Sequence, residues 1–179
     1  QNLIGKVLIT NMKGEIVKAR IVETEAYSWR EKGCHAFGGK QTQRNAVMFQ
    51  PGGVAYVYLC YVVHNLLNIV TNEADIAEAV LVRAVEPVEG IDIMRERRGN
   101  LKNDFHLTSG PGKLTKAMGI DLTMNGKSFF DNEIWLEDDG YFVSPASIKA
   151  GPRIGIDYAG EDAKLPWRFW IASNKWVSG

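Results

Sequence analysis

Residues 15–27, EIVKARIVETEAY, are the stretch that decides the fold. Apolar and β-branched side chains alternate there with polar ones, which is typical of a strand with one face turned to a core. Residues 3–10, LIGKVLIT, are also rich in strand-forming side chains, and residues 12–14, MKG, have the character of a turn. The start of the chain is therefore predicted to be two strands that return on each other.

More strands and two short helices are expected along the rest of the chain. A helix is predicted from Pro87 with a stop at Gly99, and another opens at residues 109–112 and runs through Met118. Further strands are predicted at residues 54–61, 66–71, 79–84, 133–137, 153–158 and 167–172, the first two forming a hairpin. The order lacks βαβ repetition, so we expect one mixed α/β domain of the α+β type.

Composition and charge exclude several classes of protein. The chain has 179 residues, of which 45% are hydrophobic and 23% charged, as in ordinary globular domains, so disorder and collagen are excluded. Its 21 basic residues balance 21 acidic ones, and the pI is about 7.0. Because the mean field is near zero, any binding to nucleic acid has to come from a local basic patch.

Cysteine and histidine usage argues against disulfides and metals. Cys34 and Cys60 alone make no disulfide framework, which favours a reducing compartment. The three histidines are scattered and match no common zinc spacing, so no metal is expected. The longest apolar stretch, residues 54–70, is interrupted by His64 and Asn68, so no membrane span is expected.

Two carboxylates and a phenol lie close together at the end of the deciding stretch. On a strand, Glu23, Glu25 and Tyr27 point to one face, just before the long polar loop at residues 28–51. One interpretation is a solvated strand face. The other is a carboxylate poised as a general base or electrostatic stabiliser, with Tyr27 as a recognition ring.

The predicted hairpin carries three tyrosines with different expected surroundings. Tyr56 and Tyr58 share one face and are explained either by core packing or by a binding site. Tyr61 lies near the predicted tip, where packing explains it less well. A ring at an exposed tip is suited to insertion between bases in place of a nucleotide that has left the stack.

Polar groups within apolar runs are further candidates. Arg83 lies in the strand AVLVRA and needs an acidic partner, which from the sequence is equally Glu86 or Glu25. Asn68 in LLNIV is either a satisfied core amide or a pocket-lining group. Residues 109–113, SGPGK, open a helix with small residues and a lysine, which suits either a phosphate or ordinary capping.

These residues, taken in order, resemble the alkyladenine (3-methyladenine) DNA glycosylase family. The resemblance extends from near Gln1 to WVS at 176–178 and so covers nearly the whole chain. Its motifs are IVETEAY at 21–27, CHAFGG at 34–39, QTQRN at 41–45, MF at 48–49, PG at 51–52, YVY at 56–58, Asn68, RAVEP at 83–87, EG at 89–90, SGP at 109–111, KL at 113–114 and RIG at 153–155. The ordered set is far more specific than any single motif.

The resemblance implies a monofunctional base-excision repair enzyme that needs no cofactor and leaves an abasic site. Its expected partner is double-stranded DNA containing damaged purines, namely 3-methyladenine, 7-methylguanine, hypoxanthine or ethenoadenine. The implied fold is a single domain built on a curved antiparallel β-sheet, with flanking helices and a protruding β-hairpin. Residues 1–179 would form one catalytic domain, with a trimmed N-terminus because the chain starts near a predicted strand.

The resemblance also implies roles at the reacting bond and around the base. Glu25 matches the carboxylate that activates water, and Arg83 matches the arginine that holds both that carboxylate and the water. The backbone carbonyl of Ile154 matches a further contact to the water. Tyr27 matches the ring that stacks on the flipped base, and Tyr58 packs on its other side.

The remaining implied roles concern recognition of the base and the duplex. His35 would lie at the edge of the base, Asn68 would disfavour guanine, and Tyr61 would wedge into the duplex. The hairpin tip, CYVVHN at 60–65, departs from the Gly and Met that family members often have after the tyrosine. We expect the patch that faces phosphates to consist of Lys40, Arg44, Lys113 and Lys116.

Two other functions are compatible with the residues. One is a non-catalytic nucleic-acid-binding module that keeps the tyrosine hairpin. The other is a hydrolase of a different glycoside that uses Glu23 and Glu25. For the glycosylase we expect a monomer, in the cytoplasm and nucleoid of a bacterium or in the nucleus of a eukaryote.

Overall fold

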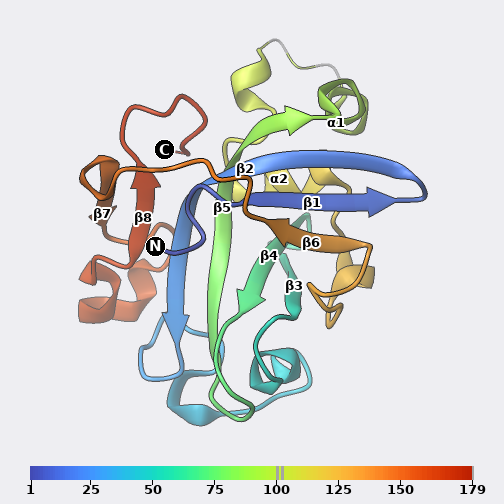
Figure 1. Cartoon of the computed structure of the whole chain (residues 1–179). Coiled ribbons are helices and arrows are strands. Elements are labelled where there is room, and N and C mark those ends of the chain that lie inside the picture. The colour runs from blue at the N-terminus through green and yellow to red at the C-terminus, as the bar shows by residue number, and fades with distance from the viewer. Residues whose placement is uncertain (100, 102, 179) are drawn as a thin grey trace.

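The strands form one strongly curled antiparallel sheet in this computed structural model, which describes residues 1–99, 101 and 103–178 (Figure 1). Their order is β3-β4-β5-β2-β1-β6, with β8 also paired to β2 and β7 paired to β8. The bounds are β1 Val7–Met12, β2 Glu15–Ser28, β3 Ala55–Cys60, β4 His64–Val70, β5 Glu78–Glu89, β6 Ile134–Glu137, β7 Ile148–Gly151 and β8 Arg168–Ile171.

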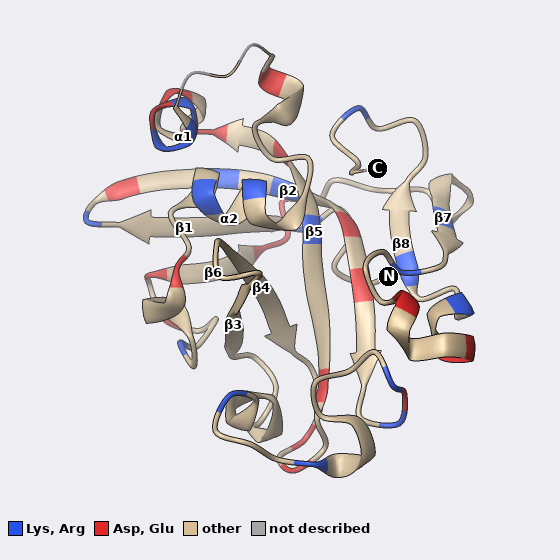
Figure 2. Ribbon diagram, turned by 180° about the vertical axis from the view of Figure 1, so that it is seen from behind, with Lys and Arg blue, Asp and Glu red and all other residues tan. Residues whose placement is uncertain are grey.

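Helices cover part of this sheet. α1 (Ile91–Arg98) and α2 (Pro111–Met118) pack on each other, and α2 also packs on β4 and β5 (Figure 2). Short 3-10 helices lie at Phe37–Gly39, Ala46–Phe49, Asp104–His106, Leu122–Met124, Pro145–Ser147 and Asp157–Lys164. The fold is the predicted single-domain α+β fold with a curved antiparallel sheet. No helix within the described residues has the length and apolar character that a membrane crossing requires.

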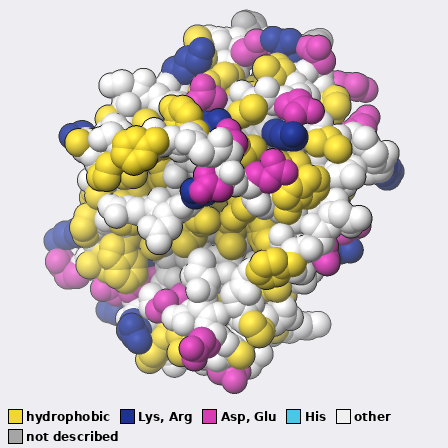
Figure 3. Space-filling view, in the orientation of Figure 1, with side chains coloured by type: hydrophobic (Ala, Val, Ile, Leu, Met, Phe, Trp, Pro, Cys, Tyr) yellow, Lys and Arg dark blue, Asp and Glu magenta, His cyan; other side chains and the backbone are white. Residues whose placement is uncertain are grey.

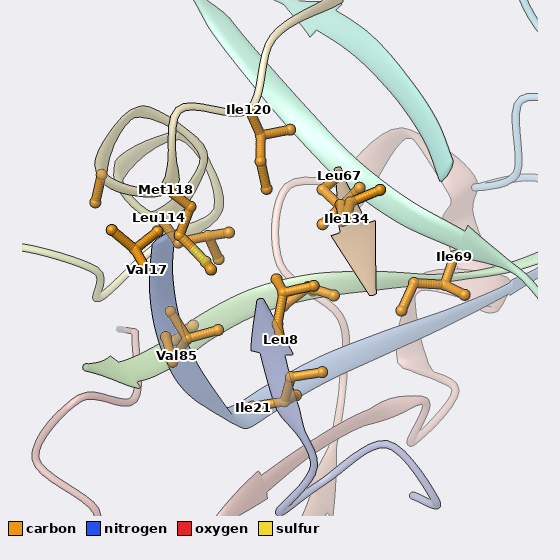
Figure 4. Packing of buried hydrophobic residues seen from close by; sticks show 14 of the residues in the cluster. Leu8, Val17, Ile21, Leu67, Ile69, Val85, Leu114, Met118, Ile120 and Ile134 are labelled. Atoms are coloured by element: carbon orange, nitrogen blue, oxygen red, sulfur yellow. The ribbon is translucent and has the colours of Figure 1, made fainter. Parts of the chain in front are cut away.

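The core lies in the curl of the sheet, beneath α2. Leu8, Ile21 and Val85 from three strands meet Leu114 and Met118 from α2, and all are fully buried (Figure 4). The alternating apolar residues of 15–27 form the contribution of β2 to this core. Full burial of each such side chain contributes about 1.5–3 kcal/mol relative to exposure.

A bulge in β2 directs its acidic residues away from this core. The pairing register with β5 shifts between Ile21 and Glu23 and again between Glu23 and Thr24. Bulges of this kind re-aim side chains and are common beside active sites. Ile21 and Val22 consequently both pack in the core, whereas Glu25 is buried among polar partners.

Two predicted boundaries are wrong. β1 begins at Val7 instead of residue 3, because residues 2–5 form a turn with Gly5 at φ 89°. Pro87 lies in β5 and not in a helix. β4 pairs with β5 only as far as Leu81, so Pro87 stands on a stretch without a strand on that side, where its missing N–H costs no ladder hydrogen bond.

Gly90 forces the change from strand to helix at Ile91. It has φ 77°, and a Cβ there would lie 2.8 Å from the carbonyl oxygen of Ile16 and 2.7 Å from Val17 Cγ1. Only glycine suits this combination of a left-handed conformation and a close approach. The predicted stop at Gly99 and the predicted helix through Met118 are confirmed.

Residues 153–158 are wrongly predicted as a strand. Gly155 has φ 80°, and a 3-10 helix, Asp157–Lys164, follows. The N–H of Ile154 donates to the side chain of Glu25 instead of to a neighbouring strand. The short strand β7, which pairs with β8, is absent from the predicted elements because its sequence, IKAG, has too few strand-forming residues.

Candidate active site

A cavity of about 430 Å³ lies where the end of β2, the middle of β5 and the β3–β4 hairpin meet the segment at residues 154–158. Its walls combine aromatic rings with a few polar groups, as is usual in sites that bind a small ring system. The residues that give these walls their chemical character are Tyr27, His35, Tyr58, Asn68, Arg83 and Ile154.

The carboxylate of Glu25 lies directly behind this wall and is fully buried. Its Oε2 accepts a hydrogen bond of 2.8 Å from the Tyr27 hydroxyl, and its Oε1 accepts one of 2.7 Å from the backbone N–H of Ile154. Arg83 Nη1 lies 3.2 Å from the same Oε1. All three partners line the cavity, so Glu25 is held directly behind the cavity lining by residues that face the cavity.

Arg83 bridges two buried carboxylates. Its Nε donates to Glu23 Oε1 at 3.2 Å, while its Nη1 faces Glu25. From the residues alone Glu86 and Glu25 are equal candidates for its partner, and the resemblance implies Glu25. The structure places Glu25 and also Glu23 against Arg83. Glu86 instead accepts a hydrogen bond from Asn174. Acidic positions of β2 and a basic position of β5 lie side by side in Figure 2.

Glu23 takes no part in lining the cavity. Its Oε2 accepts a 2.7 Å hydrogen bond from the Ser178 N–H, and Arg168 Nε lies 3.5 Å from its Oε1. Two carboxylates are thus compensated by two guanidinium groups, which offsets the large desolvation cost of burying each ion. Glu23, Glu25 and Tyr27 are gathered together as the strand pattern predicts, but only Glu25 contacts cavity-lining groups on three sides.

A second buried ion pair borders the site, and sequence reasoning misses it. Arg153 donates to both oxygens of Glu31, at 2.7 and 2.8 Å, and both side chains are almost completely buried. Its guanidinium carbon lies 4.7 Å from the centre of the Tyr27 ring. One signal in the sequence points to this pair, because the charged Arg153 opens residues 153–158, whose pattern otherwise favours an apolar strand.

Aromatic rings form one wall of the cavity. Tyr56 and Tyr58 pack with ring centres 5.4 Å apart, and the His35 ring lies edge-on to Tyr58 at 4.6 Å. Burial, followed by the charge of Glu25, raises the pKa of Tyr27 well above its usual value, so its hydroxyl keeps its proton and donates. Burial also raises the pKa of Tyr56 to about 12.

His35 is neutral near pH 7. Its Nδ1 shares a 2.8 Å hydrogen bond with the Tyr56 hydroxyl. Desolvation of the ring, helped by the positive charge of Arg44, lowers the pKa of His35 to about 4. The side-chain amide of Asn45 fixes this part of the loop by donating to the carbonyl oxygen of His35 at 2.8 Å. The ring therefore presents a neutral nitrogen edge at the rim of the cavity.

The long polar loop has a small core of its own. Cys34, Met48 and Tyr56 pack there with Val70 and Ala79 from the neighbouring strands. The loop therefore forms a wall of the site and is not an open connection. Cys34 and Cys60 are both free thiols in the described chain, and burial raises the pKa of Cys34 to about 11. No group of three or more metal-ligating side chains comes together among the described residues.

The hairpin tip projects apolar side chains into solvent. Tyr61 is 83% exposed and Val62 is 86% exposed, with φ of 49° and 63°. Positive φ is unusual for a β-branched residue and marks strain. α2 braces this hairpin just behind its tip, because Thr115 Oγ1 donates to the Asn65 carbonyl at 2.7 Å. A Cβ on Gly112 would lie 2.9 Å from the side chain of His64, so glycine permits this contact.

Only one of the four predicted phosphate-facing cations is among the residues that line the cavity. Arg44 lines it and lies 5.5 Å above the Tyr58 ring. Lys113 follows Pro111, a lining residue, by two positions, whereas Lys116 stands in the last turn of α2. None of these three, nor Lys40, forms an ion pair with a carboxylate of the described chain.

Comparison with known proteins identifies the family. A family model described as methylpurine-DNA glycosylase (MPG) matches residues 1–175. The chain belongs to the methylpurine-DNA glycosylase family. The matched residues include Glu25, Arg83 and Ile154, so the cavity and its buried acid lie within the part that carries the family resemblance.

Bacterial relatives match over nearly the whole length of both chains. A protein of Alkaliphilus oremlandii is 45% identical, with 99% of this chain and 91% of the relative covered, and one of Natranaerobius thermophilus is 44% identical with the same coverage. A protein of Bacillus subtilis is 40% identical over 99% of this chain and 88% of its own. All three are named "Putative 3-methyladenine DNA glycosylase". This methylpurine-DNA glycosylase is thus a DNA repair enzyme, a hydrolase of N-glycosyl bonds with DNA as its substrate.

Proposed function

We propose that this glycosylase removes alkylated and deaminated purines from double-stranded DNA and leaves an abasic site. The substrates we propose are 3-methyladenine, 7-methylguanine, hypoxanthine and ethenoadenine. Residues 1–179 act as one catalytic domain and as a monomer. We place its action in the cytoplasm, on the DNA of the nucleoid, because the relatives that match it are bacterial proteins.

The position of Glu25 is the observation that carries this proposal. Each oxygen of a carboxylate has two lone pairs. Among the described residues, one lone pair of Oε2 accepts the hydrogen bond from the Tyr27 hydroxyl. The second lone pair of Oε2 can therefore accept a hydrogen bond from water. Arg83 and the Ile154 N–H hold Oε1 and thereby set the direction of the carboxylate.

The chemical step is hydrolysis at the C1′ carbon of the deoxyribose. Glu25 takes a proton from the bound water while the water oxygen bonds to C1′, and the electron pair of the broken glycosidic bond leaves with the base. Its negative charge also stabilises the positive charge that develops on the sugar. Alkylated purines are good leaving groups, so their glycosidic bonds need less help than those of normal purines.

The cavity walls hold the flipped base. Tyr27 and Tyr58 supply aromatic faces, and stacking of a base on such a face contributes about 1–3 kcal/mol. Because His35 is neutral and bound through Nδ1 to Tyr56, its other nitrogen is available to the edge of the base. Asn68, which is buried and donates to the Tyr56 carbonyl at 3.3 Å, disfavours guanine by meeting its exocyclic amine.

The duplex approaches along the hairpin and its neighbouring cations. Tyr61 inserts where the flipped nucleotide has left the stack, which offsets part of the cost of flipping. Lys40, Arg44, Lys113 and Lys116 contact phosphates. The face seen in Figure 3 mixes both signs of charge and apolar groups without one dominant basic area. Because the whole chain has no net charge, we assign DNA binding to these few cations.

The two alternative functions have less support. A non-catalytic binding module has no need of a buried carboxylate held by three cavity-lining partners. A hydrolase of another glycoside that uses Glu23 together with Glu25 requires both carboxylates to be held toward the cavity. Glu23 shares only Arg83 with the cavity lining and is otherwise held by Ser178 and Arg168.

The test is base release from duplexes that each carry one damaged purine. We predict that Glu25→Gln lowers the single-turnover rate at least about 100-fold while duplex affinity changes little, because the amide keeps the size of the side chain but cannot take the proton. Release is measured by cleavage of the product strand at abasic sites.

Glu86→Gln is the matched control. Glu86 is on β5 near Arg83, but its carboxylate bonds to Asn174 and does not reach Glu25. We expect this variant to retain the wild-type rate. Wild-type turnover by Glu25→Gln would remove Glu25 from the mechanism, and binding without any base release by the wild type would favour the binding module.

A further inference from the structure

The cavity is bordered by the Arg153–Glu31 pair, which takes no part in the proposed hydrolysis or in base recognition. We propose that Arg153, held by Glu31, is a positioning residue that sets the geometry of Glu25 and Tyr27 for the chemical step. This inference rests on the proposed function of the same site. It assigns Arg153 no contact with the substrate.

Arg153 is fixed in a single orientation by four hydrogen bonds. Its two terminal nitrogens donate to Glu31 at 2.7 and 2.8 Å, in the two-pronged geometry that is the most directional available to an arginine. Nη1 also donates to the Ala26 carbonyl at 2.9 Å, and Nη2 to the Asp162 carbonyl at 3.1 Å. A lysine offers a point charge and cannot hold all of these acceptors in one plane.

These contacts act on the site from two directions. Ala26 is the residue between Glu25 and Tyr27, so the bond to its carbonyl fixes the main chain that carries both side chains. Ile154 follows Arg153 directly, and its N–H donates to Glu25 Oε1 at 2.7 Å. Restraining Arg153 therefore restrains the donor that aims Glu25.

The guanidinium also supports the stacking ring. It lies 4.7 Å from the centre of the Tyr27 ring, on a side chain that lines the cavity. Glu31 extends the restraint to a further lining residue, because its Oε2 accepts a 2.7 Å hydrogen bond from the N–H of Gly33. The ion pair thus connects Tyr27, Ile154 and Gly33, and small displacements of such groups slow a reaction strongly.

Arg20 provides a matched comparison within the same chain. It also forms a two-pronged pair, with Asp139 at 3.0 and 2.7 Å, and it donates to a backbone carbonyl, that of Gly5. Neither Arg20 nor Asp139 lines the cavity, and Tyr141 is the ring beside Arg20. The Arg20 pair is more exposed than the Arg153 pair, so its substitution reports what the loss of a forked ion pair away from the cavity does to the fold.

The experiment compares Arg153→Lys with Arg20→Lys on duplexes containing ethenoadenine. We measure the single-turnover rate per folded protein, the duplex affinity and the fluorescence change of the ethenoadenine base on binding. For Arg153→Lys we expect a rate roughly 10- to 100-fold lower, with duplex affinity within a few-fold of wild type and an altered fluorescence change. Arg20→Lys should keep the wild-type rate and fluorescence.

Glu31→Gln is the second variant if Arg153→Lys does not fold. It keeps the size of the side chain and the bonds from Arg153 to the two carbonyls, and we expect a smaller rate loss in the same direction. A folded Arg153 or Glu31 variant with the wild-type rate overturns this inference and leaves the proposed function intact. A wild-type protein that releases no base overturns both.

Discussion

Glu25 shows how a buried charge can be held ready for chemistry. Its side chain is fully buried, yet each oxygen accepts a hydrogen bond and Arg83 lies 3.2 Å away. Without such partners a carboxylate would not remain charged in a site with little water. Because Arg83 is shared with Glu23, the removal of either acid changes the partner of the other.

His35 predicts how stability depends on pH. Its pKa falls from 6.5 to about 4 on folding, through desolvation of the ring and then the charge of Arg44. The unfolded chain therefore binds the proton more readily, so this contribution to stability is full above pH 6.5 and declines as the pH falls toward 4.

We predict that His35→Gln makes the loss of stability between pH 6.5 and pH 4 shallower than in the wild type. The measurement is urea unfolding at a series of pH values. Since part of His35 is exposed at the rim, the difference should be modest. Parallel curves for the two proteins would contradict the prediction. His106, on a 3-10 helix outside the cavity, provides the control substitution.

Among the elements, the β3–β4 hairpin combines support just behind its tip with strain at the tip itself. α2 holds the strand at Asn65 through Thr115, while Tyr61 and Val62 at the tip have positive φ and are mostly exposed. Exposed apolar groups in strained conformations do not stabilise a folded chain, and such strain concentrates at functional positions. The tip is therefore suited to contact something outside the protein.

We predict that Tyr61→Ser lowers base release from duplex DNA about tenfold or more. Flipping a base out of the duplex costs a few kcal/mol, and the variant lacks the inserted ring that offsets part of this cost. Release from a single-stranded oligonucleotide should fall much less. The melting temperature should change little, since the ring is 83% exposed. Phe130→Ser, which removes another ring that is 89% exposed but outside the cavity, is the control. Equal losses on both substrates would argue against a wedge.

At the scale of the whole molecule, DNA binding has to work with no net charge. The 21 basic and 21 acidic residues cancel, and many cations are engaged by carboxylates, as Lys18 is by Glu89 at 3.1 Å. The four cations that we assign to phosphates lack such partners in the described chain, so their charges are available to the duplex. Association should consequently be weakly steered, and its salt dependence should be modest because few phosphates are contacted.

We predict that Lys113→Gln reduces the slope of log affinity against log salt concentration by about one, because one phosphate contact and its released counterion are lost. The measurement is fluorescence anisotropy of a labelled duplex at several salt concentrations. Lys18→Gln removes a cation that is already paired and should leave the slope unchanged. An unchanged slope for Lys113→Gln would place that lysine outside the DNA-binding face.

Most elements could be predicted because their signals are local. The alternation of residues 15–27 predicts β2, Gly99 and Gly119 stop the helices, and the aromatic run before Tyr61 predicts the hairpin. The errors at Pro87 and at residues 153–158 have one cause. The partner that each backbone position requires depends on which strands lie beside it. Pro87 faces a side without a strand, and the N–H of Ile154 bonds to a side chain instead of a strand.

By itself, the sequence determined the α+β class, the family and the set of residues around Glu25, because hydrophobic periodicity and ordered motifs are carried along the chain. Only the tertiary structure decided which charges meet. Arg83 pairs with Glu23 as well as with the Glu25 that the resemblance implies, and Arg153 pairs with Glu31 at a separation of 122 residues. A buried ion is stabilised by the groups that surround it in space, and their distance along the chain does not matter.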